Sequence, residues 1–234
     1  MSIIYHDRIL PHQDFNSNLF KNDKLNYMSS LYDLLTDFSS EINHKKFILN
    51  EHHRVSFEEM STPPIQLALL KFLIGITNTK TFLEIGTFIG NTSMHVASFI
   101  GKGANVVTLE KFKEFAILAK KNFKDNNLED TISLHHGDAY ETMKSLEDNF
   151  FNFIYVDGDK GRYPELCELA EKKLSENGLI LVDDVLFHGD VLNQKQDTDK
   201  GLGCKKVLEI YKNNKNFYKY LIPINNGILL LKRI

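Results

Sequence analysis

The stretch F-L-E-I-G-T-F-I-G at residues 82–90 sets the expected fold. A short apolar run ends at Gly86 and a helical pattern begins after Gly90, so the two glycines frame a tight turn between a strand and a helix. The G-x-G-x-x-G spacing of dinucleotide sites is absent, because Phe88 stands two residues after Gly86. A helix N-terminus after such a turn favours an anionic group. The stretch therefore predicts a ligand-binding turn, with an ordinary strand–turn–helix unit as the alternative.

Similar apolar runs recur along the chain and alternate with helical patterns. The runs are at residues 81–85, 105–109, 131–135, 153–156, 179–182, 218–222 and 228–231, and the helical stretches are at 90–100, 112–126, 139–146 and 164–175. This alternation is typical of parallel strands with helical crossovers. The last two runs are separated by a short loop and indicate an antiparallel hairpin. We expect a doubly wound, Rossmann-like α/β fold with a seven-stranded, mostly parallel sheet.

The composition is that of an ordinary globular protein. The 234 residues are 42% hydrophobic and 25% charged, with a formal net charge of -3. Residues 1–25 lack periodicity and indicate a mobile or partner-dependent arm, whereas residues 25–42 predict an amphipathic helix. We expect an N-terminal helical extension over residues 1–58 and one sheet domain over residues 59–234. Neither a signal peptide nor a membrane span is recognised, so we expect a cytoplasmic protein without membrane contact.

Acidic residues stand at the expected ligand end of the sheet. In open α/β sheets, ligands bind outside the carboxyl ends of the strands. Glu84, near the end of the first strand, would attract an ammonium or sulfonium group and repel a phosphate. Glu110 could accept hydrogen bonds from ribose hydroxyls, and Asp138 could accept one from an adenine amino group. These three strand ends describe a nucleoside with a zwitterionic tail, which S-adenosylmethionine fits better than NAD.

Two further strand ends carry pairs of carboxylates. Asp157 and Asp159 follow the fourth expected strand, and Asp183 and Asp184 follow the fifth. Carboxylates crowded at neighbouring strand ends are costly unless a cation neutralises them. Oxygen ligands indicate a hard divalent ion, Mg²⁺ first, with Ca²⁺ or Mn²⁺ as alternatives. A pair of solvated acidic loops is the other interpretation.

The ordered set of motifs resembles the metal-dependent catechol and caffeoyl-CoA O-methyltransferase family, within the class I methyltransferases. The motifs are F-L-E-I-G-T-F-I-G (82–90), Glu110, G-D-A (137–139), V-D-G-D-K-x-x-Y (156–163), V-D-D-V-L (182–186) and I-P-I-N-N-G-I-L-L-L (222–231). The resemblance implies an S-adenosylmethionine- and metal-dependent enzyme that methylates a hydroxyl of a catechol-like or hydroxylated aromatic small molecule. It also implies a homodimer.

The resemblance assigns roles to individual residues. It implies cofactor contacts for Met60, Glu84, Gly86, Thr87, Thr92, Glu110, Asp138, Ala139 and Asp157, and metal ligation by Asp157, Asp183 and Asp184. Lys160 would act as the base beside the metal, and Asp157 would share the catalytic role. The chain departs from the family pattern at Asp184, where Asn is usual, and at Asn91, where Tyr is common.

Other functions compete with this interpretation. An enzyme of the same fold could methylate a hydroxylated wobble uridine in tRNA; the basic segment 205–219 favours such a partner, whereas the net charge of -3 does not. A cofactor-binding protein without catalysis and a nucleotide-dependent oxidoreductase belong to different classes. The set of Asp157, Lys160 and Asp183 argues against the first, and the turn at Gly86 argues against the second.

Overall fold

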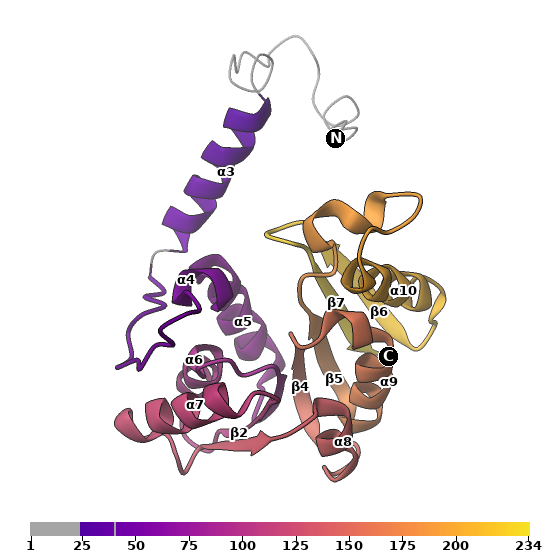
Figure 1. The fold of residues 1–234 in the computed structure, drawn as a ribbon. Helices are drawn as coiled ribbons and strands as arrows, with labels where there is room; N and C mark the ends of the chain where they lie inside the picture. The colour runs from indigo at the N-terminus through magenta and orange to yellow at the C-terminus, as the bar shows by residue number, and fades with distance from the viewer. Residues whose placement is uncertain (1–23, 40) are drawn as a thin grey trace. The chain divides into compact units, whose positions relative to one another are not determined.

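The computed structural model describes residues 24–39 and 41–234 (Figure 1). The chain divides into two compact units, residues 1–42 and 43–234. In the first unit the described part centres on helix α3 (Lys24–Phe38), which confirms the helix predicted over residues 25–42 although it ends earlier. The arm expected over residues 1–25 lies outside the described residues, except that its last two residues begin α3.

The second unit is built on a seven-stranded sheet of order β3-β2-β1-β4-β5-β7-β6. The strands are β1 (Thr81–Ile85), β2 (Asn105–Glu110), β3 (Ile132–His136), β4 (Phe151–Val156), β5 (Leu174–Val182), β6 (Phe217–Ile222) and β7 (Ile228–Arg233). Strands β1 to β5 pair in parallel, and β7 runs antiparallel to both β5 and β6. This confirms the predicted mostly parallel sheet with its terminal hairpin.

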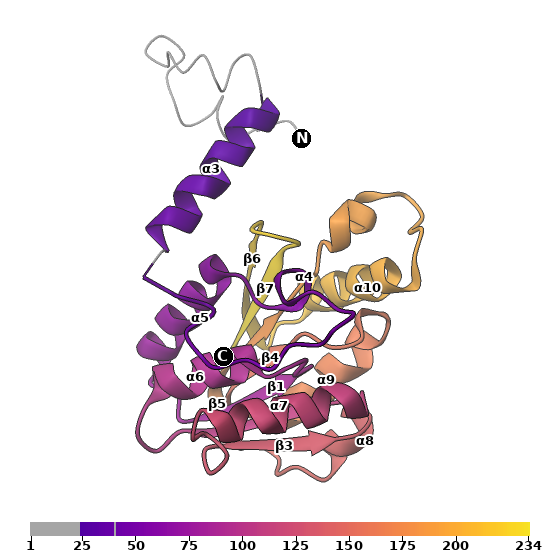
Figure 2. The same ribbon diagram turned by 60° about the vertical axis from the view of Figure 1, so that its left-hand side comes forward.

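Helices cover both faces of this sheet. They are α4 (Phe57–Met60), α5 (Pro64–Thr77), α6 (Asn91–Ile100), α7 (Lys113–Asp125), α8 (Ala139–Lys144), α9 (Tyr163–Lys173) and α10 (Asp199–Asn213), with short 3₁₀ helices η1 (Lys160–Arg162) and η2 (Phe187–Leu192). Figure 1 shows α5, α6 and α7 on one side and α8, α9 and α10 on the other. In Figure 2, α7 lies alongside the edge strand β3. None of the described helices combines the length and apolar character that a membrane crossing needs.

Because side chains alternate along a strand, β1 packs against the helices on both faces of the sheet. Successive residues of a strand point to opposite faces. Leu83 and Ile85 are fully buried in the apolar core shared with α9. Glu84, between them, points to the other face, where Ser93 of α6 donates a hydrogen bond to its carboxylate. An acid is thereby buried beneath the turn that follows β1.

Residues 43–58, which the sequence places in the extension, belong to the compact sheet unit. The backbone N–H of Ile48 donates to Asn126 Oδ1 at 3.0 Å, and that of Asn50 donates to Asn122 Oδ1 at 2.6 Å. Both acceptors lie on α7 or at its C-terminal end. This segment is therefore fastened to the helix layer that borders the site.

Candidate active site

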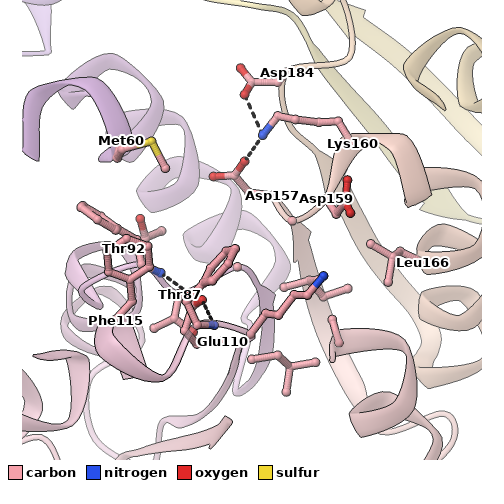
Figure 3. Close-up of a pocket in the computed structure, with 18 of the residues that line it drawn as sticks. Met60, Thr87, Thr92, Glu110, Phe115, Asp157, Asp159, Lys160, Leu166 and Asp184 are labelled. Carbon is pink, nitrogen blue, oxygen red and sulfur yellow. Dashed lines mark hydrogen bonds and ion pairs between the residues drawn. The ribbon is translucent and has the colours of Figure 1, made fainter. Parts of the chain in front are cut away.

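A cavity of about 430 Å³ opens at the carboxyl ends of the parallel strands (Figure 3). It lies where the strand order reverses between β1 and β4, the place at which open α/β sheets bind ligands. The sequence-predicted residues that line it are Met60, Gly86, Thr87, Thr92, Glu110, Asp138, Ala139, Asp157, Lys160 and Asp184. Glu84 and Asp183 are buried outside this lining. The fold thus gathers most of the predicted site in one hollow, while the individual roles stay predictions.

The turn after β1 depends on glycine. Gly86 has φ of 102°, and a Cβ built there would lie 2.2 Å from the backbone oxygen of Asp157. At Gly90, with φ of 88°, a Cβ would lie 2.3 Å from the ring of Phe123. Any side chain at either position would force the neighbouring structure to move. The turn therefore holds the ends of β1 and β4 close together on the cavity floor.

Glu110 organises the neighbouring turns. Its Oε1 accepts from the backbone N–H of Phe112 and its Oε2 from that of Phe88, both at 2.8 Å (Figure 3). Burial raises the pKa of Glu110, and the backbone hydrogen bonds oppose that shift. A carboxylate has about four acceptor positions. Glu110 thus fixes both turns at the edge of the cavity, and its contact with ribose hydroxyls stays a prediction.

Asp138 is engaged more fully than the sequence suggests. Its Oδ1 accepts from the backbone N–H groups of Tyr140 and Glu141, at 3.1 and 3.3 Å, and so caps α8. Its Oδ2 forms an ion pair with Arg162, which also pairs with Glu165. The sequence did not predict the ion pair between Asp138 and Arg162, because the two residues are 24 positions apart and meet only where the N-terminal ends of α8 and α9 lie close together.

Lys160 lies at the centre of the acidic end of the cavity. Its Nζ is 2.9 Å from Asp157 Oδ1 and 2.9 Å from Asp184 Oδ2, and Figure 3 shows it pointing between them. Burial by itself would lower the pKa of Lys160, but the two carboxylates outweigh burial and raise it well above its usual value. Burial also raises the pKa of Asp157, with Lys160 opposing the shift. With both acids in contact, the ammonium stays protonated.

Asp183 belongs to a separate, buried hydrogen-bond network. Its Oδ2 accepts from Tyr155 Oη and from Gln66 Nε2, both at 2.6 Å, and its Oδ1 accepts from the backbone N–H of Asp184 at 2.8 Å. Asn225, in the loop between β6 and β7, donates to Gln66 Oε1 at 3.0 Å. Burial, reinforced by the charge of the neighbouring acids, raises the pKa of Asp183 to about 7. The sequence missed Tyr155 and Gln66, which look like core residues there.

The predicted metal ligands are close in the fold without converging on one point. Asp157 and Asp184 meet at Lys160, whereas the Asp183 carboxylate faces Tyr155. Within residues 24–39 and 41–234, no three His, Cys, Asp or Glu side chains are placed to hold a metal ion. The donor chemistry nevertheless suits a hard cation, because two carboxylates, those of Asp157 and Asp184, meet one ammonium, and a third carboxyl group, that of Asp183, lies next to Asp184 in the chain.

Glu84 lies under the first turn. It is 1% exposed, and its Oε2 accepts from Ser93 Oγ and, at 2.5 Å, from Thr108 Oγ1. Burial raises the pKa of Glu84 to about 8, although both hydroxyls act to lower it. A contact between Glu84 and a cofactor amino group stays a prediction of the resemblance.

The fold and the cavity define a class I methyltransferase-like protein, and comparison with known proteins gives the family. The model of the family described as O-methyltransferase matches residues 37–234. The chain therefore belongs to the O-methyltransferase family and is an enzyme of that class, as its motifs predicted.

Relatives named for their activities support the same family. The chain is 29% identical over 220 residues to the "Probable caffeoyl-CoA O-methyltransferase 2" of Dictyostelium discoideum, covering 92% of this chain and 93% of the relative. It is 28% identical over 141 residues to the "Catechol O-methyltransferase" of Mycobacterium tuberculosis, covering 60% and 64%. The solved structure of the O-methyltransferase TomG from Streptomyces achromogenes, in complex with SAM, matches with a TM-score of 0.75 at 21% identity, over 86% of this chain and 96% of that one.

Proposed function

We propose that this protein transfers a methyl group from S-adenosylmethionine to a hydroxyl of a catechol-like or hydroxylated aromatic small molecule, with the help of a divalent cation. The observation that carries the proposal is the placement of Lys160, between Asp157 and Asp184, in the same cavity as the turn at Gly86 and the ribose candidate Glu110. A methyl donor and a group able to accept a proton would therefore share one site.

The strand order supports the orientation of the cofactor. Ala139 follows β3, Glu110 ends β2 and Thr87 follows β1, and these three strands are neighbours in that order. Adenine beside Ala139 and ribose beside Glu110 would direct the methionine part towards Thr87 and Met60. The sulfonium methyl would then lie on the side of the cavity that leads to Lys160. TomG, a structural neighbour, is described in complex with SAM.

The acidic end suits a divalent cation. Asp157, Asp183 and Asp184 would hold it, Mg²⁺ first, with Ca²⁺ or Mn²⁺ as alternatives, because carboxylate oxygens suit hard ions. A bound ion of this kind supplies charge that makes a coordinated hydroxyl more acidic. Burial, and after it the charges of Asp157 and Asp184, raise the pKa of Asp183. Added positive charge would relieve the repulsion among these three acids.

The chain's own residues would do the remaining work. When the charges of Asp157 and Asp184 are compensated, the pKa of Lys160 falls towards its usual range and its amine can accept the hydroxyl proton. The acceptor oxygen then bonds to the methyl carbon as the carbon–sulfur bond breaks, and the proton passes to Lys160 Nζ. Most of the rate gain would come from holding the two reactants in line.

The test is a methyl-transfer assay with labelled S-adenosylmethionine. We expect transfer to members of a catechol panel, no transfer to bulk tRNA, and loss of turnover with EDTA that Mg²⁺ restores. If methyl transfer occurs to tRNA alone, the proposed small-molecule acceptor is wrong. If EDTA does not change turnover, the proposed metal dependence is wrong. Calorimetry with S-adenosylmethionine and with NAD decides which cofactor binds, since tight binding of NAD would overturn the proposed cofactor.

The homodimer implied by the resemblance is also a proposal, and light scattering tests it.

A further inference from the structure

We propose that Lys200 pairs with a negatively charged group on the acceptor, so that the enzyme prefers hydroxylated aromatic acids to neutral or cationic catechols. The inference rests on the proposed methyl transfer and deepens it, because it gives the charge of the acceptor and the residue that selects for that charge.

Lys200 lies in the wall at the acidic end of the cavity. It lines the same hollow as Lys160 and is the second residue of α10. The start of α10 packs directly on η1, the helix that begins with Lys160, since a Cβ built at Gly203 would lie 2.1 Å from the backbone oxygen of Lys160. Lys200 Nζ is also 6.0 Å from the centre of the Phe187 ring, and Phe187 follows Asp184 by three residues. Lys200 therefore belongs to the side of the cavity where the acceptor would be held.

The charge of Lys200 is not compensated within the described part of the chain. The basic residues that line the cavity are Lys111, Lys160, Arg162 and Lys200. Lys160 and Arg162 each pair with two carboxylates. Lys200 pairs with no carboxylate among residues 24–39 and 41–234, and the ring of Phe187 holds its ammonium at the wall without neutralising it. Lys111 stands next to Glu110 at the end of β2, where the ribose would lie. An acceptor therefore has Lys200 as its cationic partner.

The rest of the lining disfavours an anion. The carboxylates in the lining outnumber the basic groups by six to four, and they are those of Glu59, Glu110, Asp138, Asp157, Asp159 and Asp184. This excess of one sign repels a negatively charged acceptor and attracts a positively charged one. Lys200 opposes this effect at one point of the wall. A carboxylate is the group that matches it, because an ammonium pairs with a carboxylate through charge-assisted hydrogen bonds.

The cofactor also carries a carboxylate, but the fold separates it from Lys200. The methionine part would be directed towards Met60, which precedes α5, and Thr87, which precedes α6. Helix α10, which carries Lys200, lies on the other side of the sheet from α5 and α6 (Figure 1). This arrangement favours the acceptor as the partner of Lys200, and binding of a cofactor product tests the alternative.

The test is methyl-transfer kinetics on the full chain with catechols that differ in charge. The acceptors are 3,4-dihydroxybenzoate and 3,4-dihydroxycinnamate, which are anionic, catechol, which is neutral, and dopamine, which is cationic. The wild type should show its lowest KM with one of the acids. Lys200→Met should raise that KM about fivefold, which corresponds to the roughly 1 kcal/mol of an exposed ion pair, while kcat stays within about twofold. Lys200→Glu should raise it further and lower the KM for dopamine. Lys206→Met, exposed on α10 outside the lining, is the control and should change neither.

Two further measurements separate the possible outcomes. The KM and kcat for catechol should not change in Lys200→Met, which also shows that the variant is folded. The Kd of S-adenosylhomocysteine should stay within about twofold in calorimetry, and a weakening as large as the change in KM would assign Lys200 to the cofactor and overturn the inference. Unchanged KM values for both acids, equal changes for acids and catechol, or a wild type that prefers dopamine would also overturn it. If the wild type methylates none of the four acceptors, the proposed function fails as well. If it methylates acids and catechol equally well, only the role of Lys200 is refuted.

Discussion

Replacing Glu84 with Gln should stabilise the unliganded protein at neutral pH. The Glu84 carboxyl is 1% exposed, and burial raises its pKa from 4.5 to about 8. Between these values the unfolded chain has released a proton that the folded state keeps, so stability falls as the pH rises. One pKa unit corresponds to 1.36 kcal/mol. The difference between the folded and unfolded pKa of Glu84 therefore lowers the free energy of unfolding by about 3 kcal/mol at pH 7 and about 4 kcal/mol at pH 8. Gln has nearly the same shape and does not titrate.

Urea denaturation at pH 4.5, 6, 7 and 8 would measure this gain. The free energy of unfolding of Glu84→Gln should exceed that of the wild type by about 3 kcal/mol at pH 7, and the difference should shrink towards zero at pH 4.5. In a chain of this size, 3 kcal/mol corresponds to a Tm increase of about 6–12 °C. Glu176→Gln, at an exposed position on β5, is the control and should shift stability by no more than about 0.5 kcal/mol.

A gain that does not depend on pH, or a loss of stability at pH 7, would refute the reasoning, because both outcomes require Glu84 to be stably ionised in the folded state. The same variant also tests the role implied by the family resemblance. If Glu84 holds the amino group of the cofactor, the stabilised variant should bind S-adenosylmethionine more weakly. Stability and binding would then change in opposite directions at one residue.

Three other substitutions test the site and its support. Lys160→Met should lower kcat at least about 100-fold while cofactor binding persists, because the expected base is gone; near-normal turnover in single-turnover assays would exclude that role. His95 is 1% exposed and burial lowers its pKa to about 4, so the wild type loses stability as the pH falls from 6.5 to 4. The wild type should lose about 2–3 kcal/mol of unfolding free energy by pH 4.5, and denaturant titrations of His95→Leu should not show this loss. If the unfolding free energies of the two proteins fall in parallel with pH, the prediction is wrong. Tyr155→Phe should lower the free energy of unfolding by about 1–3 kcal/mol, because it removes the hydroxyl that donates to Asp183 at 2.6 Å. Tyr163→Phe should lower it less, because the hydroxyl of Tyr163 makes only a 3.4 Å contact. Equal losses in the two variants would show that burial of the hydroxyl, and not its hydrogen bond, sets the effect.

Local patterns carried the prediction of the fold because they depend on short-range geometry. The apolar runs matched strands β1 to β7 to within a few residues at most ends, since each run has the length and residue types of a buried strand. Gly86 and Gly90 signalled the turn because positive φ and close approach exclude other residues there. The sequence indicated helix α10 only as a basic segment, interpreted as a solvated helix face or a phosphate-binding patch, because its helical pattern is too weak to give the bounds of the helix.

The sequence by itself determined which strand ends carry acids and that these acids meet at one edge of a parallel sheet, because β1 to β5 all end there. The tertiary structure alone decided where each carboxylate points. Asp183 and Asp184 are neighbours in the chain, yet Asp183 turns to Gln66, 117 residues away, and Asp184 turns to Lys160. Asp184 has φ of 53°, a left-handed backbone that sends the two side chains in different directions. Partners so distant in the chain leave no local pattern, and only the packing of α5 and η1 against the sheet brings them to their acids.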